Sequence, residues 1–307
     1  MSILKLRGSA LEHAAAPSYA ADLLTLTKPR ITGFVALAAF VGAALGAPHG
    51  TSLWHCAWTG LLVMLCSASA SAFNQTLERD LDRLMERTRE RPVPTARVSV
   101  RDAILFATVL GAVGVAGIAL LCNLLAAFLA LGTLFTYVAV YTPLKRYSSL
   151  NTVIGALPGA APPLVGYVAT AEHVGEWAWA LFAILFVWQF PHFLAIAWLF
   201  REDYARAGLK MLPAMPGGER VTGRSAFLYS LVLLPVSIAP VVIGIASWTY
   251  LSGALVCGAA YAASSAWFAL RSNETTARAL LIVSLFYLPA VFACVFLDPL
   301  VRAQLFG

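Results

Sequence analysis

Long apolar runs alternate with short polar connections along almost the whole chain. Nine of these runs are long enough to be interpreted as membrane-spanning helices, each of which needs about 20 mostly apolar residues. The predicted spans are residues 31–47, 55–75, 103–121, 124–142, 152–170, 177–199, 226–246, 249–270 and 279–297. The connections between them are short, so the pattern predicts an all-α, polytopic membrane protein without a large extramembrane domain.

Composition and charge placement agree with this pattern. Of the 307 residues, 60% are hydrophobic and 12% are charged, which excludes an ordinary soluble enzyme. A net charge of +6 would suggest a nucleic-acid partner in a soluble protein, but here its distribution argues for a membrane protein without nucleic acid. Of 21 Lys and Arg residues, 20 fall in the N-terminal region and in alternate connections, and the remaining one is Arg302. By the positive-inside rule, the N-terminus and the 76–102 and 200–225 loops are cytoplasmic, and the C-terminus lies outside.

The sequence predicts two regions in the chain. Residues 1–29 have no continuous apolar core and are interpreted as a cytoplasmic N-terminal arm, and residues 30–307 as a single transmembrane domain. The five cysteines lie singly in or beside apolar segments, a pattern that implies neither a disulfide nor a zinc site.

An acidic stripe follows the second span. If that helix continues past Phe73, Asn74, Glu78 and Asp82 recur every four residues and share one face. Oxygen ligands at this spacing suit a hard cation such as Mg2+. The competing interpretation is a solvated helix with many salt bridges. It is favoured by the interleaved arginines Arg79, Arg83, Arg87, Arg89 and Arg91.

A second acid, Asp203, follows the sixth span and lies near Arg201 and Lys210. A Mg2+ diphosphate between the two acidic segments would be held by carboxylates through the metal and by basic side chains directly. Lys145 and Arg146, after the fourth span, are further candidate phosphate donors. For each of these basic residues, anchoring of the topology is an equally good explanation.

Three features inside or beside the spans have open interpretations. Three prolines within residues 152–170 predict a broken helix that lines the interior. Tyr141 and Lys145 are four residues apart, but Pro143 between them leaves their shared face open. His192 lies within the sixth span, on the same stripe as Asp203 if the helix is continuous, and is either a hydrogen-bonded packing residue or a ligand.

Taken together, these segments resemble the UbiA-type intramembrane prenyltransferases and, within that family, the heme O synthases. The resemblance runs from "LTKPRI", which begins at Leu26, through the last spans. Its most specific parts are the Asn74, Glu78, Asp82 stripe and the segments "MERTRERP", "YTPLKR", "WQFPHF" and "REDYARAGLKMLP".

The resemblance implies nine helices around a central cavity, with a Mg2+-bound isoprenoid diphosphate beneath the cytoplasmic loops of a cell inner membrane. The reaction it implies is transfer of farnesyl from farnesyl diphosphate to a vinyl group of heme B, which gives heme O. It also implies surrounding membrane lipid and heme-handling partner enzymes in the same membrane. Two positions depart from the wider family: Glu78 replaces the commoner Asp, and Ala207 stands where many members have a second Asp.

The resulting hypothesis assigns a role to each residue. Glu78, Asp82 and Asp203 bind Mg2+, and Asn74 completes and orients that cluster. His192 contacts heme, as an axial ligand or at a propionate. Diphosphate is bound by basic side chains, together with Tyr141 of the Tyr-x3-Lys element. The predicted basic residues are Arg87, Lys145, Arg146, Arg201 and Lys210.

Two other functions fit parts of the pattern. An enzyme that prenylates a quinone precursor such as 4-hydroxybenzoate would use the same metal site. A transporter for an anionic lipid or a cation also combines broken helices with carboxylates at its entrance. Ionisable residues near the middle of the bilayer would be expected in a transporter, whereas here the acids gather at one face.

Overall fold

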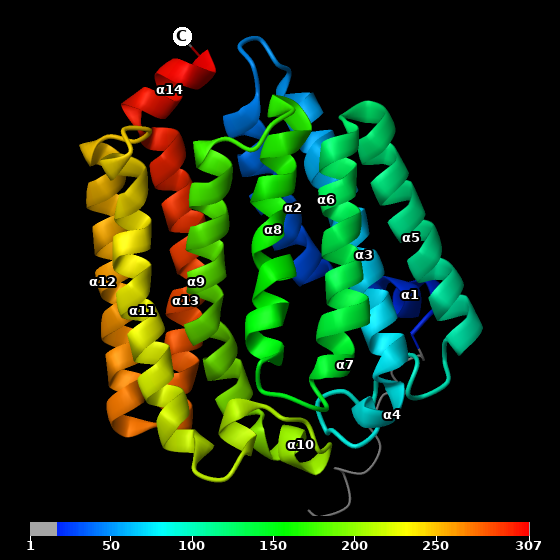
Figure 1. Ribbon diagram of the computed structural model, residues 1–307. Coiled ribbons are helices and arrows are strands. Elements are labelled where there is room, and N and C mark those ends of the chain that lie inside the picture. The colour runs from blue at the N-terminus through cyan, green and yellow to red at the C-terminus, as the bar shows by residue number, and fades with distance from the viewer. Residues whose placement is uncertain (1–16, 307) are drawn as a thin grey trace, which may run out of the picture.

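The computed structural model describes residues 17–306, and within this range it contains helices and no strand (Figure 1). Nine of the described helices are long and apolar enough to cross a membrane. They are α2 (Pro29–Gly46), α3 (Leu53–Leu77), α5 (Val100–Leu121), α6 (Leu124–Phe135, extended to Leu144), α8 (Asn151–Ala171), α9 (Glu176–Leu199), α11 (Gly218–Val242), α12 (Trp248–Arg271) and α13 (Glu274–Leu297). The short elements are α1 (Tyr19–Thr27), α4 (Arg79–Asp82), η1 (Thr136–Tyr141), α7 (Thr142–Leu144), α10 (Arg201–Arg206), η2 (Leu212–Ala214) and α14 (Pro299–Phe306).

The predicted all-helical class and the nine spans are therefore confirmed. The largest difference at a helix start is at α11, which begins at Gly218 and not near residue 226. Its first turn carries Glu219 and Arg220, which project beyond the apolar stretch, so hydrophobicity does not mark the start of the helix. Gly217, with a φ of 73°, ends the preceding loop at this point.

Of the predicted N-terminal arm, residues 1–16 lie outside the described range. The rest contains α1, whose first turn is capped by the Ser18 hydroxyl. Asp22 of α1 forms an ion pair with Arg97 at 3.0 Å, and Leu26 is fully buried against Ala72 and Val93. This helix is thus held against α3 and the loop that follows α4.

The bundle has two groups of helices with α9 between them (Figure 1). Helices α11, α12 and α13 pack on one side of α9, and α8 joins it to α2, α3, α5 and α6 on the other. Glycine allows α2 and α8 to approach closely. A Cβ atom at Gly42 would collide with the carbonyl oxygen of Pro163, and one at Gly166 with that of Ala39. Small residues at such contacts let helix backbones meet where lipid provides little hydrophobic driving force.

Helix α8 corrects one prediction and supports another. The expected break is wrong, because α8 runs unbroken over Asn151–Ala171 with Pro158, Pro162 and Pro163 inside it. The interior position is confirmed, since α8 is the most buried of the nine candidate spans. A buried helix tolerates internal prolines because neighbouring helices can donate hydrogen bonds to the carbonyl groups that lose their usual N–H partner.

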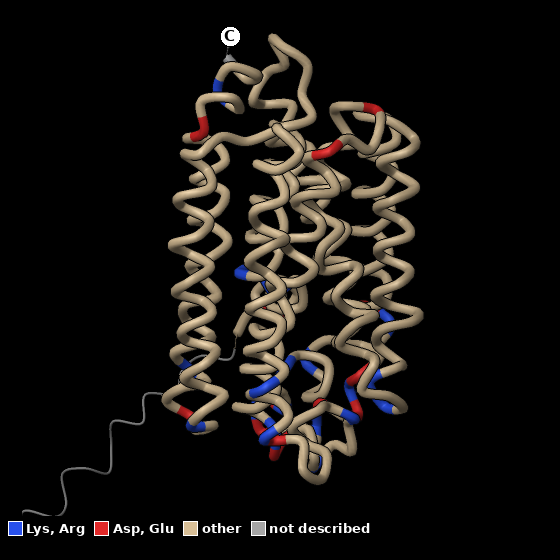
Figure 2. The backbone as a smooth tube through the Cα atoms, turned by 60° about the vertical axis from the view of Figure 1, so that its left-hand side comes forward, with Lys and Arg blue, Asp and Glu red and all other residues tan. Residues whose placement is uncertain are grey.

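Most of the basic residues gather at one end of the bundle (Figure 2). This basic end carries α4, α7 and α10, whereas α14 and Arg302 lie at the opposite end (Figure 1). The two long charged loops therefore meet on one side, as the charge pattern predicts. The orientation of the bundle in the membrane and the central cavity remain predictions.

Candidate active site

The acidic stripe is present at the basic end of α3. Helix α3 ends at Leu77, and Glu78 links it to α4 with φ and ψ of −94° and 7°. Helical spacing nevertheless continues, because the Glu78 amide donates to the Asn74 carbonyl at 3.0 Å and the Asp82 amide to the Glu78 carbonyl at 2.8 Å. All three side chains are buried. The four-residue backbone spacing thus continues across the change of helix.

Glu78 and Lys145 form a buried ion pair. The Lys145 Nζ atom lies 2.9 Å from Glu78 Oε1 and 3.1 Å from Oε2, and the Asn74 amide donates to Oε2 at 2.8 Å. Lys145 also lies 4.7 Å from the centre of the Tyr141 ring. Tyr141 and Lys145 therefore share a face, which settles the question that Pro143 had left open.

A π-helical turn makes this geometry compatible with proline. The Thr142 amide donates to the Tyr137 carbonyl, five residues earlier, and the Thr142 hydroxyl donates to the same carbonyl at 2.9 Å. A wide turn and a side-chain donor satisfy backbone groups near Pro143, which has no N–H of its own. The Asn74 amide donates to Thr142 Oγ1 at 3.3 Å, so the turn is linked directly to the acidic stripe.

Asp82 is paired with Arg91. The Arg91 Nη1 atom lies 2.9 Å and 2.8 Å from the two carboxylate oxygens, and the Asp82 side chain is 1% exposed. Burial raises the pKa of Asp82 above its ordinary value, and the positive charge of Arg91 opposes that rise. The salt-bridge interpretation is thus correct for Asp82 and Arg91, and for exposed Asp80, which contacts Arg83 at 3.3 Å.

Lys28 is a site residue that the sequence reasoning missed. It joins α1 to α2 in the left-handed region, with φ 51° and ψ 65°. Burial, together with the nearby positive charges of Arg91 and Lys145, lowers the pKa of Lys28 to about 7, although Glu78 and Asp82 act in the opposite direction. The only available signal was a lysine directly before the first span, which the positive-inside rule already explained.

Asp203 connects the two long loops. Its carboxylate accepts hydrogen bonds from the Glu86 amide at 3.2 Å and the Arg87 amide at 3.3 Å, and it forms an ion pair with Arg206 at 3.0 Å. Helix α9 ends at Leu199 and α10 begins after Phe200, so the single continuous helix on which the shared stripe of His192 and Asp203 depended is absent. Asp203 occupies a loop-bridging position that lies at the same end as Glu78 and Asp82.

The carboxylates are not assembled into a ready metal site. Within residues 17–306, no three side chains of His, Cys, Asp or Glu are close enough to hold a metal ion. Glu78, Asp82 and Asn74 nevertheless provide buried oxygen donors, the chemistry that Mg2+ prefers. These residues fit a Mg2+ diphosphate, whose negative charge would also suit Lys28, Arg91 and Lys145.

The other basic residues predicted to bind diphosphate have different surroundings. The Arg87 guanidinium stacks 4.6 Å from the centre of the Phe200 ring and donates to the Tyr204 hydroxyl at 3.4 Å. Arg146 is exposed. The Lys210 amide donates to the Lys145 carbonyl at 2.9 Å, so its loop adjoins the ion pair.

Arg201 has partners other than the Glu78 and Lys145 pair. It binds Glu219 at 2.9 Å and stacks 4.2 Å from the centre of the Trp198 ring. It lines a cavity of about 670 Å³ at the basic end, together with Glu202 and Arg220. Sequence position does not distinguish this environment from that of Lys145, because both are basic residues after a span.

His192 lies on α9 and contacts α13. Its Nδ1 atom lies 2.7 Å from Ser284 Oγ, and its ring stacks against Trp188 with centroids 5.1 Å apart. Ser284 Oγ donates to the Leu281 carbonyl at 2.6 Å, so it accepts from His192 Nδ1–H. The Nε2 atom therefore carries the free lone pair of a neutral imidazole.

The described residues thus form an all-helical bundle with apolar spans and with buried acids and cations at one end. Residues 35–290 match the UbiA prenyltransferase family, and the chain belongs to that family. It is a multi-pass membrane protein.

Among its curated relatives are protoheme IX farnesyltransferases. The protein from Solibacter usitatus is 38% identical over 286 residues, which cover 90% of this chain and 98% of the relative. The protein from Gloeobacter violaceus is 41% identical over 285 residues, covering 90% and 91% respectively.

Solved structures share the fold. A digeranylgeranylglyceryl phosphate synthase superposes with a TM-score of 0.73 at 16% identity, covering 94% of this chain and 99% of the other. A UbiA homologue from Archaeoglobus fulgidus, bound to GPP and Mg2+, superposes with a TM-score of 0.59 at 21% identity, covering 89% and 99%.

Proposed function

We propose that this protein transfers a farnesyl group from farnesyl diphosphate to a vinyl group of heme B and so forms heme O. The observation that carries the proposal is the near full-length identity of about two residues in five with protoheme IX farnesyltransferases. The buried polar cluster at the basic end supports it, because diphosphate chemistry needs both acids and cations.

The diphosphate site lies around Glu78 and Lys145. Lys145, Lys28 and Arg91 bind the phosphate oxygens and stabilise the charge that develops as the allylic C–O bond breaks. Asn74 holds Glu78 through the 2.8 Å hydrogen bond and thereby fixes the carboxylate. Arg87 and Lys210, on the two loops that meet there, and the more exposed Arg146 extend the positive field around the diphosphate.

Mg2+ is the proposed cofactor, with Glu78, Asp82 and Asn74 as its holders and Asp203 joining from the second loop. When bound, it neutralises the diphosphate leaving group. The ion pairs of Glu78 with Lys145 and of Asp82 with Arg91 give each buried carboxylate a cationic partner. A bound diphosphate gives the same cations a new anionic partner, which leaves the carboxylates available to the metal.

His192 is the proposed contact to heme. Ser284 fixes the tautomer, so Nε2 presents its lone pair to the heme iron, and Trp188 fixes the ring plane. The vinyl carbon attacks farnesyl C1 as diphosphate leaves, and the cation left on the vinyl group takes hydroxide from water, which releases one proton. The products of this balanced step are heme O and diphosphate.

The basic end faces the cytoplasm in this proposal, within a cell inner membrane and with the C-terminus outside. The support is the gathering of Lys and Arg at one end. Heme-handling enzymes in the same membrane are the proposed partners, because both heme B and heme O are too apolar to be exchanged readily through water.

The test is incubation of purified protein with heme B, farnesyl diphosphate and Mg2+, followed by mass analysis of the heme. The expected product gains a farnesyl group and one hydroxyl group. Replacement of heme B by 4-hydroxybenzoate should give no prenylated product. Prenylated 4-hydroxybenzoate with unchanged heme would overturn the proposal.

A matched pair of variants tests the site in the same assay. Glu78→Gln should lower turnover by about 100-fold or more, the order seen when one group that stabilises transition-state charge is lost. Asp80→Asn is the control, because Asp80 lies two residues away but its side chain is 63% exposed. Equal turnover of both variants would show that Glu78 has no role in the reaction.

A further inference from the structure

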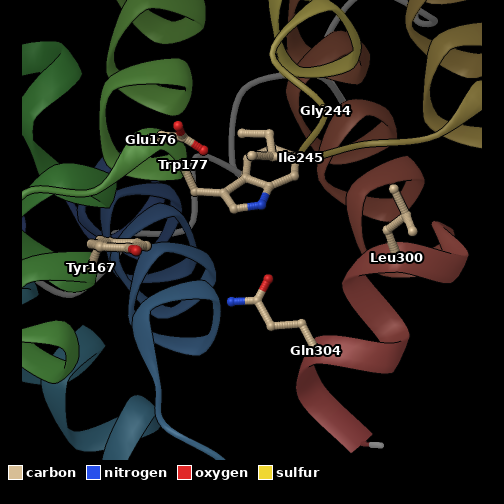
Figure 3. A pocket seen from close by; sticks show the side chains of 7 residues that line it. All are labelled: Tyr167, Glu176, Trp177, Gly244, Ile245, Leu300 and Gln304. Atoms are coloured by element: carbon tan, nitrogen blue, oxygen red, sulfur yellow. The ribbon is translucent and has the colours of Figure 1, made fainter.

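A second polar cavity lies at the opposite end of the bundle, remote from the proposed reaction site (Figure 3). Its volume is about 340 Å³, which is within the range of small-ligand cavities. It is open to the surface and is lined by Tyr167 of α8, the start of α9, the turn after α11, and α14. Trp177 and Glu176 come from α9, Ile245 from the turn, and Leu300 and Gln304 from α14.

The indole of Trp177 has an unmatched hydrogen-bond donor. Trp177 is 4% exposed, and its Nε1–H has no partner among residues 17–306. Figure 3 shows this nitrogen turned toward the space above Gln304. A buried donor without an acceptor costs free energy, and an acceptor atom of a bound molecule would recover it.

Acceptor groups line the same cavity. The Gln304 Nε2 atom donates to the Leu45 carbonyl at 3.1 Å, which leaves Oε1 as an acceptor. Glu176 is exposed, and no ion pair joins it to another described residue. The cavity thus combines one unsatisfied donor with a carboxylate and an amide oxygen.

The local charge favours a cation beside Glu176. Among the described residues, the acids at this end are Glu172 after α8, Glu176 at the start of α9 and Asp298 before α14, and the Lys or Arg residue there is Arg302 of α14. Asp298 is already engaged by hydrogen bonds from Ser247 and Leu300. Glu176 is therefore the carboxylate best placed to receive an ammonium group from outside the chain.

We propose that this cavity binds the headgroup of an ethanolamine phospholipid. The primary ammonium donates to Glu176 and Gln304, and a phosphate or ester oxygen accepts from Trp177 Nε1–H. The cavity lies where the spans end, at the depth of lipid headgroups, and Leu300 and Ile245 provide apolar contact for the glycerol. A choline headgroup carries no N–H, so the site discriminates against it.

The experiment is native mass spectrometry of the full chain in detergent, titrated with phosphatidylethanolamine and with phosphatidylcholine of the same acyl chains. The wild type should bind the ethanolamine lipid more tightly. Glu176→Gln and Trp177→Phe should each weaken that binding by about tenfold, the order expected for one hydrogen bond involving a charged group. Glu172→Gln is the matched control, because Glu172 is an exposed acid at the same end that does not line the cavity.

The outcomes separate the alternatives. A preference for ethanolamine lipid that is lost in Glu176→Gln and Trp177→Phe and kept in Glu172→Gln supports the proposal. Equal binding of both lipids, or a preference unchanged by Glu176→Gln, overturns it. Glycerophosphoethanolamine, which has no acyl chains, is titrated in parallel, and binding as tight as that of the lipid would overturn the assignment to a membrane lipid.

Discussion

His192 and Ser284 are joined across α9 and α13 by a 2.7 Å hydrogen bond, although they are 92 residues apart in the sequence. Because Ser284 Oγ gives its own proton to the Leu281 carbonyl, the bond fixes the proton of the histidine on Nδ1. Nε2 is then the atom that can bind a metal. In the proposed heme contact, the serine would act through the histidine, as a positioning residue.

The first prediction concerns this pair. Ser284→Ala removes the acceptor for Nδ1–H and should weaken heme binding by about tenfold, as losses of groups that orient a metal ligand do. The heme absorption spectrum of purified protein checks this.

Ser284→Thr keeps the oxygen and should restore the wild-type spectrum. Ser237→Ala, which removes another buried interhelical hydroxyl bonded to Tyr287, is the control. An unchanged spectrum in Ser284→Ala would show that Ser284 does not position His192.

The ion pair of Glu78 and Lys145 gives the second prediction. Lys145→Met leaves a buried carboxylate without its cation and should lower the free energy of unfolding by roughly 3 kcal/mol. Adding Glu78→Gln removes the unpaired charge and should restore most of that stability, while prenyl transfer stays lost. Unfolding in detergent and turnover are measured on the same samples. Recovery of both properties in the double variant would mean that the pair is structural only.

Lys28 gives the third prediction, which concerns protons. Its lowered pKa of about 7 leaves it largely neutral at pH 8 before substrate binds. A diphosphate beside it favours the charged form and raises the pKa, so binding takes up a proton at pH 8. Calorimetry with a non-hydrolysable farnesyl diphosphate analogue, in two buffers of different ionisation enthalpy, measures this uptake.

The control for that measurement is the Lys28→Met variant. It should bind the analogue more weakly, with little proton uptake at pH 8. The same uptake in the variant as in the wild type would assign the proton to another group. As pH rises above 7, wild-type affinity for the analogue should fall, whereas that of the variant should change less.

The fourth prediction concerns stability at the opposite end. Asp298 is fully buried and accepts from the Ser247 amide and hydroxyl, the Tyr250 amide and the Leu300 amide, at 2.6 to 3.1 Å. Burial alone would raise the pKa of Asp298, but these hydrogen bonds outweigh it and lower the pKa. Asp298→Asn should therefore cost about 2 kcal/mol of unfolding free energy at pH 7.

The sign of its pH dependence follows from the lowered pKa. The stabilisation by Asp298 is fully present above the unfolded-state pKa, near 4, and is lost as pH falls through the lower folded-state value. The difference in thermal stability between wild type and Asp298→Asn should thus be large at pH 7 and shrink below pH 4. A difference that grows on acidification would contradict the capping role.

Local pattern was enough for the spans and for the spacing of Asn74, Glu78 and Asp82. Each depends on residues close in sequence, through hydrophobic length and helical periodicity. The same reasoning failed where backbone details intervene. Phe200 interrupts the path from His192 to Asp203, and α8 absorbs its prolines without a break. Neither outcome follows from composition, because each depends on what packs around the segment.

The sequence by itself determined the nine apolar spans found in residues 17–306 and the gathering of charge at one end. Bilayer thickness and the cost of burying charge leave few other arrangements for such a pattern. Only the tertiary structure decided the pairings: Lys145 with Glu78 across 67 residues, Arg91 with Asp82, and Arg201 with Glu219. Any arginine or lysine can neutralise any nearby carboxylate, so the partner is set by which helix ends the packed bundle brings together.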